Sequence, residues 1–256
     1  MTRILLTNDD GYFAPGIQAA KRALEAVPDW EVVIVAPDRE QSASSHALTL
    51  HRPLRLDQVE RDVYKVDGTP TDCALLGLRG GLAVPPTLVV SGINAGGNMG
   101  EDVTYSGTVA AAMEGTILGV PSISVSLVGD RHFETAAHVT VRIVREVLQR
   151  GLPPATLLNV NVPDRPLDQL SGIAITSQSR RTYEDQVVTK RDPRGRVYFW
   201  IAGDVPQWFA DNGSDYAAVN SGTVSVTPLH LDMTNPHALT ELRNWSLSLN
   251  NEPPRE

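Results

Sequence analysis

Side chains that carry oxygen ligands recur at three places in the chain, each directly after a short apolar run. They are Asn8, Asp9 and Asp10 after residues 3–7, Asp38, Gln41, Ser42 and Ser44 after residues 31–36, and Asn94 and Asn98 after residues 88–91. If these runs are strands of one parallel sheet, their carboxyl ends bring the side chains to one edge. Carboxylate, hydroxyl and amide oxygens without histidine or thiol suit a hard divalent cation such as Mg²⁺ or Mn²⁺ and suit zinc poorly. The sequence therefore predicts a metal site at that edge, although Asp-Asp-Gly after a strand is also typical of a turn or helix cap.

The segment Tyr105-Ser106-Gly107-Thr108-Val109 opens a predicted helix a little further along the chain. Free N–H groups and the dipole at the first turn of a helix favour a phosphate, and the two hydroxyls add donors. Ser106 on its own would equally be an ordinary N-cap. A cation beside an anion-accepting helix start is the arrangement that phosphoryl chemistry requires. The two patterns together therefore indicate chemistry on a phosphate group.

The elements that must position these side chains alternate between strand and helix. Predicted strands cover residues 3–7, 31–36, 63–66, 88–91, 122–127 and 157–162, and predicted helices begin at Pro15 and cover 70–78, 106–118 and 136–148. The strands are apolar throughout, which is expected of a parallel sheet that helices cover on both faces. We therefore expect residues 1–165 to form a doubly wound, mostly parallel, Rossmann-like α/β core that carries the metal and phosphate site.

The pattern changes in residues 166–256. Two β-prone runs, at 186–189 and 197–201, flank the turn signal at 192–195 and predict a long, exposed, charged hairpin. A strand is predicted at 222–227, and a terminal helix over 235–249 with Asn235 as N-cap and Pro236 at its first position. We expect this C-terminal part to serve oligomerisation.

Composition narrows the class of protein further. The 256 residues are 41% hydrophobic and 20% charged, which is ordinary for a soluble globular protein and excludes collagen and extensive disorder. The net charge of −8 argues against duplex nucleic acid as a partner. The single cysteine, Cys73, excludes an intramolecular disulfide and a cysteine-based zinc cluster. Neither a signal peptide nor an apolar run long enough for a membrane is found, so a cytoplasmic location is expected.

Other proteins of the same architecture fit less well. A dinucleotide-binding dehydrogenase needs G-x-G-x-x-G after the first strand, and a P-loop protein needs a Walker motif; neither is present. A phospho-receiver module shares the paired carboxylates, and Asp67 would match its third-strand aspartate. That module also needs a lysine after the fifth strand, and residues 128–131 (VGDR) contain none.

Seven sequence motifs resemble those of the SurE (survival protein E) nucleotidases. They are ILLTNDDG at 4–11 with APG at 14–16, VAPDR at 35–39, GTPTDC at 68–73, VSGIN at 90–94, YSGTV at 105–109, NVNVP at 159–163 and VSVTPL at 224–229. The motifs follow one another in order over nearly the whole chain. Where the family often has proline before the second asparagine of the glycine-rich loop, this chain has Gly97, which we expect to loosen the loop.

The resemblance implies a metal-dependent phosphomonoesterase, a 5′-nucleotidase that hydrolyses nucleoside monophosphates to nucleoside and phosphate, with short-chain polyphosphate as a further substrate in some members. By motif position, the ligands of one divalent cation per subunit, Mg²⁺ or Mn²⁺, would be Asp9, Asp10, Ser42 and Asn94. The phosphate contacts would be Asn98, Ser106, Gly107 and Thr108. The resemblance also implies exchange of the hairpin and C-terminal segment between subunits of a homodimer or homotetramer.

The expected reaction proceeds without a covalent intermediate. The cation would lower the pKa of a water molecule and offset charge at phosphorus. Either Asp9 or Asp10 would orient or deprotonate that water, and the sequence leaves open which of them does so, as it does the base preference and the choice between 5′ and 3′ substrates. The alternative hypothesis is a non-catalytic sensor module that binds a metal and a nucleotide phosphate without turnover.

Overall fold

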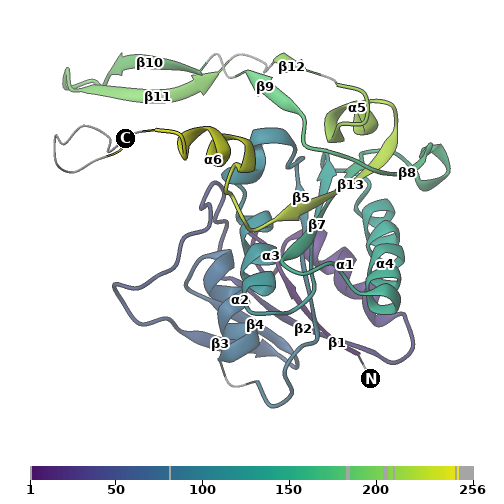
Figure 1. Ribbon diagram of the computed structural model, residues 1–256. Coiled ribbons are helices and arrows are strands. Elements are labelled where there is room, and N and C mark those ends of the chain that lie inside the picture. The colour runs from purple at the N-terminus through teal and green to yellow at the C-terminus, as the bar shows by residue number, and fades with distance from the viewer. Residues whose placement is uncertain are drawn as a thin grey trace.

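The computed structural model describes residues 2–80, 82–182, 185–203, 207–209, 211–245 and 247. A nine-stranded sheet runs through the centre of the molecule, and helices cover both of its faces (Figure 1). The strand order is β3-β4-β2-β1-β5-β6-β7-β13-β8, with the bounds β1 Thr2–Thr7, β2 Trp30–Pro37, β3 Leu56–Glu60, β4 Val63–Val66, β5 Leu88–Ala95, β6 Ser122–Val128, β7 Thr156–Pro163, β8 Gly172–Ile175 and β13 Thr223–His230. The α-helices are α1 Pro15–Glu25, α2 Pro70–Arg79, α3 Gly107–Ile117, α4 Phe133–Arg150, α5 Asp215–Asn220 and α6 Pro236–Leu242.

The direction of the chain through the sheet reverses between β1 and β5. From β1 the chain proceeds outward on one side through β2 and β4, and it then returns to pair β5 with the other side of β1. From β5 it proceeds outward through β6 and β7, again in parallel register. In sheets of this kind, a crevice for ligands opens at the carboxyl ends of the strands where the order reverses. The carboxyl ends of β1 and β5 are therefore the place to look for a site.

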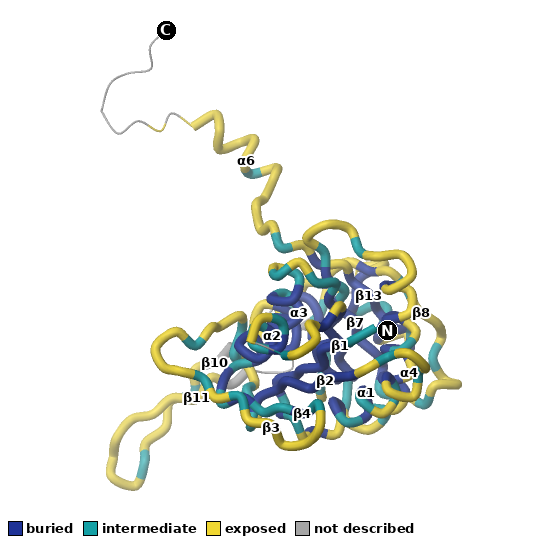
Figure 2. The backbone as a smooth tube through the Cα atoms, turned by 90° about the horizontal axis from the view of Figure 1, so that it is seen from below, coloured by how far each residue is buried: buried dark blue, intermediate teal, exposed yellow. Residues whose placement is uncertain are grey.

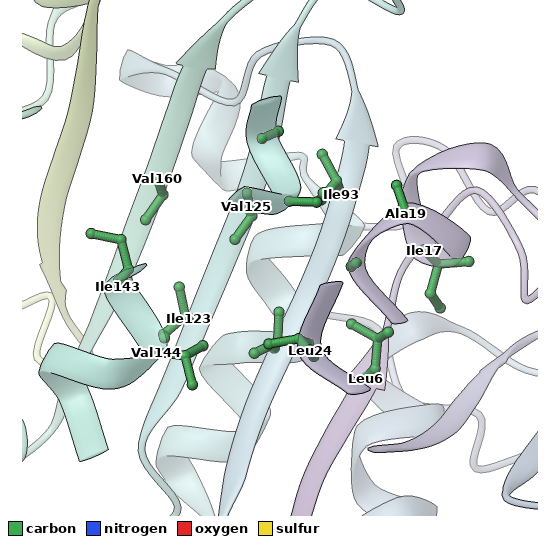
Figure 3. Close-up of a cluster of buried hydrophobic side chains, with 14 of the residues drawn as sticks. Leu6, Ile17, Ala19, Leu24, Ile93, Ile123, Val125, Ile143, Val144 and Val160 are labelled. Atoms are coloured by element: carbon green, nitrogen blue, oxygen red, sulfur yellow. The ribbon is translucent and has the colours of Figure 1, made fainter. Parts of the chain in front are cut away.

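Two apolar layers hold the sheet between its helices. Successive residues of β1 face opposite layers: Leu6 packs in the layer beneath α1 and α4 (Figure 3), and Leu5 packs in the layer that contains Cys73 of α2. All three side chains are fully buried. The strands are apolar throughout because both faces are covered, and Cys73 serves as a small buried hydrophobic residue.

The predicted elements of the core are present, and the mostly parallel α/β fold is confirmed. Among the described residues, five strands and α-helices were not predicted: β3, β8, α5 and the paired short strands β9 (Arg180–Thr182) and β12 (Gln207–Phe209). Two short 3₁₀ helices, at Gly100–Thr104 and Leu167–Gln169, were not predicted either. β13 pairs antiparallel with β7 and parallel with β8, so the sheet continues beyond residue 165. The division of the chain into two units near that residue stays a prediction.

Two segments of the C-terminal part extend away from the sheet. Strands β10 (Asp185–Arg191) and β11 (Val197–Gly203) form the expected hairpin as a separate two-stranded sheet (Figure 1). Asn235 caps α6 as expected, but the helix ends at Leu242 and not at residue 249. No residue of α6 is buried (Figure 2), so no packing supports further turns of a short helix. Residues 246 and 248–249 of the prediction lie outside the described residues.

Among the described residues, none of the helices has the length and apolar character needed to cross a membrane.

Candidate active site

A cavity of about 430 Å³ opens at the carboxyl ends of β1 and β5, where the strand order reverses. It is lined by Asp9, Asp10, Glu40, Ser42, Ala43, Asn94, Ala95, Gly97, Asn98, Asp102, Tyr105 and Ser106. A larger cavity of about 640 Å³ lies between α4 and β8, but aliphatic side chains form most of its wall. The chemistry of the lining, and not the volume, therefore identifies the candidate site.

Asp9 is held from two directions by one residue of α3. The Thr108 hydroxyl donates to Oδ1 of Asp9, and the Thr108 backbone N–H donates to Oδ2 at 3.2 Å. Asp9 is only 6% exposed, and burial raises the pKa of its carboxyl group, although the two bonds from Thr108 act in the opposite direction. The result is a buried carboxylate with a fixed orientation at the bottom of the cavity.

Gly107 allows α3 to begin this close to Asp9. A Cβ atom at Gly107 would lie 2.9 Å from Cβ of Asp9 and 2.8 Å from Oγ of Ser44, both closer than real contacts. The requirement at this position is therefore the absence of a side chain.

The start of α3 differs in one respect from the prediction. Thr108 is fully buried and its hydroxyl is taken by Asp9, so in this structure it is not available to a phosphate. The Ser106 hydroxyl accepts a bond from the N–H of Val109 as the N-cap of α3. Among the described residues, the N–H of Gly107 has no acceptor, whereas those of Thr108 and Val109 are bonded to side chains. The free donors at this helix start are thus fewer than the sequence pattern indicates.

Asp10 lies beside Asp9 and is partly exposed to the cavity. Partial burial, and then the neighbouring charge of Asp9, raise its pKa from 3.8 to about 6. The N–H of Ala95 donates to Oδ2 of Asp10 at 3.3 Å, which ties the end of β1 to the end of β5.

The amide side chains near these carboxylates divide into two kinds. Asn8 closes the turn after β1: its Nδ2 donates to the carbonyl of Gly11, and its Oδ1 accepts from the Gly11 N–H. Asn94 lines the cavity, and its Nδ2 donates to the carbonyl of Gly96 at 2.8 Å. Its Oδ1 has no donor among the described residues, so it is available as a ligand oxygen.

The loop after β2 contributes Ser42 and a carboxylate that the sequence reasoning missed. Ser42 is exposed, and its hydroxyl donates to Glu40 at 2.7 Å. Glu40 also lines the cavity; its position two residues before Ser42 was the available signal. The backbone of Ala43 is left-handed, with φ of 56°, so the chain turns sharply next to Ser42.

Asn98 is held in place by a buried pair of asparagines on β7. Its N–H donates to Oδ1 of Asn161 at 2.8 Å, and its carbonyl accepts from the amides of both Asn159 and Asn161. Its own side chain donates to the Ser126 hydroxyl at 2.8 Å. The loop that contains Gly97 is therefore firmly bonded at Asn98, contrary to the loosening expected from the missing proline.

A fourth carboxylate of the cavity wall, Asp102, forms an ion pair with Arg181 of β9, 2.6 Å apart. The Arg181 guanidinium also lies over the ring of Trp208, 5.3 Å from its centroid, and Trp208 stacks on Tyr216 at 4.5 Å. The C-terminal part of the chain thus contacts a residue of the cavity wall, which no sequence signal indicated.

Comparison with known proteins gives consistent matches over nearly the whole chain. The family model described as Survival protein SurE matches residues 4–185. The chain belongs to the SurE family. A 5′-nucleotidase SurE from Geobacter metallireducens is 54% identical over 96% of this chain and 98% of its own length, and one from Geobacter sulfurreducens is 54% identical over 96% and 94%. The crystal structure of a SurE protein from Aquifex aeolicus superimposes with a TM-score of 0.84 at 48% identity, over 94% of this chain and 98% of that one.

SurE nucleotidases depend on a metal, and the donor set of this cavity fits one. The cavity brings together four side chains that the sequence predicted at this edge of the sheet: Asp9, Asp10, Ser42 and Asn94. The pKa values of Asp9 and Asp10 are raised, and a cation bound near the two carboxyl groups would stabilise their charged forms. Among the described residues, no three histidine, cysteine, aspartate or glutamate side chains form a metal cluster. Neutral oxygens must therefore complete the coordination, as a hard cation such as Mg²⁺ allows. Four other residues that the sequence predicted at this edge of the sheet do not line the cavity: Asn8, Asp38, Gln41 and Ser44.

Proposed function

We propose that this protein is a metal-dependent phosphomonoesterase that hydrolyses nucleoside monophosphates to nucleoside and phosphate. One observation carries the proposal: the carboxylate pair Asp9 and Asp10 shares a cavity with the N-cap of α3 at the point where the strand order reverses. A cation and an anionic group can therefore be bound side by side. Relatives named 5′-nucleotidase align over nearly the full chain and point to the same chemistry.

Asp9, Asp10, Ser42 and Asn94 would hold one divalent cation per subunit, Mg²⁺ or Mn²⁺. When bound, the cation supplies charge stabilisation at the phosphoryl oxygens and makes a water molecule more acidic. Both oxygens of Asp9 accept bonds from Thr108, so this carboxylate is fixed as a ligand. Asp10 keeps Oδ1 without a donor among the described residues, and we assign to it the orientation of the attacking water and the acceptance of its proton.

The phosphate would lie against Asn98, the Ser106 hydroxyl and the Gly107 N–H. Asn98 and Ser106 line the cavity, and the Gly107 N–H has no acceptor among the described residues. Thr108 is not assigned to the phosphate, because both its hydroxyl and its N–H donate to Asp9 and position that carboxylate.

We also propose that the enzyme is cytoplasmic and that it assembles as a homodimer or homotetramer. Among the described residues, the strands of the hairpin β10–β11 pair only with each other, and the exposed apolar side chains of the hairpin include Phe199, Trp200 and Ile201. Such a surface is typical of an interface. Short-chain polyphosphate is a further candidate substrate, since a site that would bind a cation and a phosphate side by side would also accept a chain of phosphates.

The decisive experiment measures free phosphate from adenosine monophosphate with the purified protein and Mn²⁺ or Mg²⁺. An enzyme releases phosphate over many turnovers and stops when excess chelator is added. Calorimetric binding of the nucleotide without any release would instead establish the non-catalytic sensor and overturn the proposal.

A further inference from the structure

Tyr105 is the one aromatic side chain among the described residues that line the active-site cavity. Its side chain is largely open, with 57% of the residue exposed. Within the described part of the chain, its phenol has no hydrogen-bond partner and its ring stacks on no other aromatic ring. The ring therefore makes none of the directional contacts that a purely structural tyrosine usually has.

The backbone of Tyr105 is nevertheless fixed on both sides. Its N–H donates to the carbonyl of Asp102 at 3.0 Å, and its carbonyl accepts from the N–H of Ser45 at 3.2 Å. The first bond joins it to the segment that leads into α3, and the second joins it to the loop that carries Ser42. An exposed ring on a fixed backbone is pre-organised to receive a ligand.

We propose that Tyr105 is the stacking platform for the base of the nucleotide, and this inference rests on the proposed function. Tyr105 and Ser106 are consecutive residues on the wall of one cavity. The base and the phosphate of a nucleoside monophosphate are separated by a single ribose, so one ligand can reach both residues.

The rest of the cavity wall supports recognition by stacking. Its charged members are the acidic residues Asp9, Asp10, Glu40 and Asp102. Asp9 and Asp10 are assigned to the cation, Glu40 accepts from the Ser42 hydroxyl, and Asp102 pairs with Arg181. Carboxylates also offer no hydrogen-bond donors to the edge of a base. Stacking on an aromatic ring needs no such donors and tolerates any base, because every base has a π-face. Tyr105 would thus select nucleotides over sugar phosphates that lack a base.

The test compares adenosine monophosphate with ribose 5-phosphate, which lacks the base. For the Tyr105→Ala variant, we expect kcat/KM for adenosine monophosphate to fall about 5- to 150-fold, the range for loss of one base–aromatic stack. For ribose 5-phosphate we expect a change of less than about twofold, within the scatter of a neutral surface substitution. Tyr105→Phe should retain the parent preference, because stacking needs the ring and not the hydroxyl.

Phe13 provides a matched control. It is similarly exposed, at 61%, and its ring lies beside Gly11 at the end of the carboxylate loop, but it does not line the cavity. Phe13→Ala should leave the preference for the nucleotide unchanged. An equal, selective loss in this variant would place the base elsewhere and overturn the inference.

Adenosine without phosphate gives a second measurement. It should inhibit the hydrolysis of ribose 5-phosphate by the parent protein, and about 5- to 150-fold more weakly in the Tyr105→Ala variant. A parallel loss of activity on both phosphate substrates in that variant, or no loss on either, would overturn the inference while leaving the phosphatase function intact. If the parent protein releases phosphate from neither substrate, the proposed function itself fails.

Discussion

The hydroxyl of Thr108 donates to Oδ1 of Asp9, and the N–H of the same residue donates to Oδ2. One residue at the start of α3 thus fixes the carboxylate that follows β1, 99 positions away in the chain. The start of α3 and the Asp9 carboxylate are therefore coupled. A substitution in either of them is expected to change the metal affinity of the site.

Thr108→Val removes the hydroxyl but keeps the shape of the side chain and the backbone donor. A hydrogen bond to a charged group contributes about 1.5–3 kcal/mol, so we expect Mn²⁺ affinity to fall about 10- to 100-fold. Activity at low metal concentration should fall with it. Thr108→Ser retains the hydroxyl and should bind the metal as the parent protein does. Calorimetric titration with Mn²⁺ measures the metal affinity of each variant. An unchanged affinity in the valine variant would show that the bond from the Thr108 hydroxyl to Asp9 does not position a metal ligand.

Asp10→Asn keeps the size of the side chain and removes one of the two adjacent negative charges. Metal affinity should drop strongly, and activity should stay low even at high metal concentration. The metal-free protein should become more stable, because partial burial, and then the neighbouring charge of Asp9, disfavour the charged form of Asp10. Two pKa units correspond to about 3 kcal/mol, which partial exposure reduces to about 1–2 kcal/mol, or roughly 2–8 °C in melting temperature.

The exposed Asp57 on β3 provides the control for this variant, since Asp57→Asn should alter neither stability nor turnover. Full activity in the Asp10→Asn variant would show that the aspartate pair is only a turn.

The stability of the metal-free protein should depend on pH through Asp10. Its pKa is higher in the folded state, about 6, than the usual 3.8, so folding favours the protonated carboxyl group. The associated stability is complete below about pH 4 and is lost as the pH rises through 6. The melting temperature of the dialysed, metal-free protein, measured between pH 4 and 7.5, reports this dependence. The Asp10→Asn variant should show a flatter dependence of melting temperature on pH in this range. A profile that the variant shares with the parent would contradict the assignment to Asp10.

The two asparagines of β7 should differ in importance. Asn161→Ala would leave the N–H of Asn98 without its acceptor and would remove one of the two bonds to the Asn98 carbonyl. Asn159→Ala would remove the other bond to that carbonyl and the bond from the Ser124 hydroxyl, but the carbonyl keeps its bond from Asn161 and the hydroxyl keeps the Leu158 carbonyl as an acceptor. Each unsatisfied buried group costs about 1–3 kcal/mol, so we expect Asn161→Ala to be the more destabilising of the two. It should also raise KM more, because Asn98 lines the cavity. Urea unfolding and steady-state kinetics rank the two variants, and the reverse order would refute this account of the Asn98 loop.

Removal of residues 187–201 deletes most of the hairpin but leaves Arg181 and its ion pair with Asp102 in place. We expect the mass measured by light scattering to shift toward that of the monomer, because among the described residues the deleted strands form a sheet of their own, separate from the central sheet. An unchanged mass would mean that other surfaces hold the subunits together.

Within residues 1–165, the order and type of the strands and α-helices followed from the sequence alone, with the exception of β3. Apolar runs without alternation marked strands covered on both faces. The residues after their ends included those that line the cavity, although Asn8, Asp38, Gln41 and Ser44 do not line it. Because parallel strands bring their carboxyl ends to one edge, the positions of Asp9, Asp10, Ser42 and Asn94 after their strands were enough to group them at one site. Local patterns carry this information, since each strand and helix is specified by neighbouring residues.

The contacts that give each side chain its role were decided only by the tertiary structure. Thr108 turned out to hold Asp9, Asn98 is secured by asparagines more than 60 positions away, and Arg181 reaches Asp102 from the other half of the chain. The same is true of the strand pairing: β13 lies antiparallel to β7 and parallel to β8, between the two, which its own sequence does not specify. A hydroxyl or an amide bonds to whatever the fold brings within reach. Its type is therefore visible in the sequence, whereas its partner is set by packing between segments that are distant along the chain.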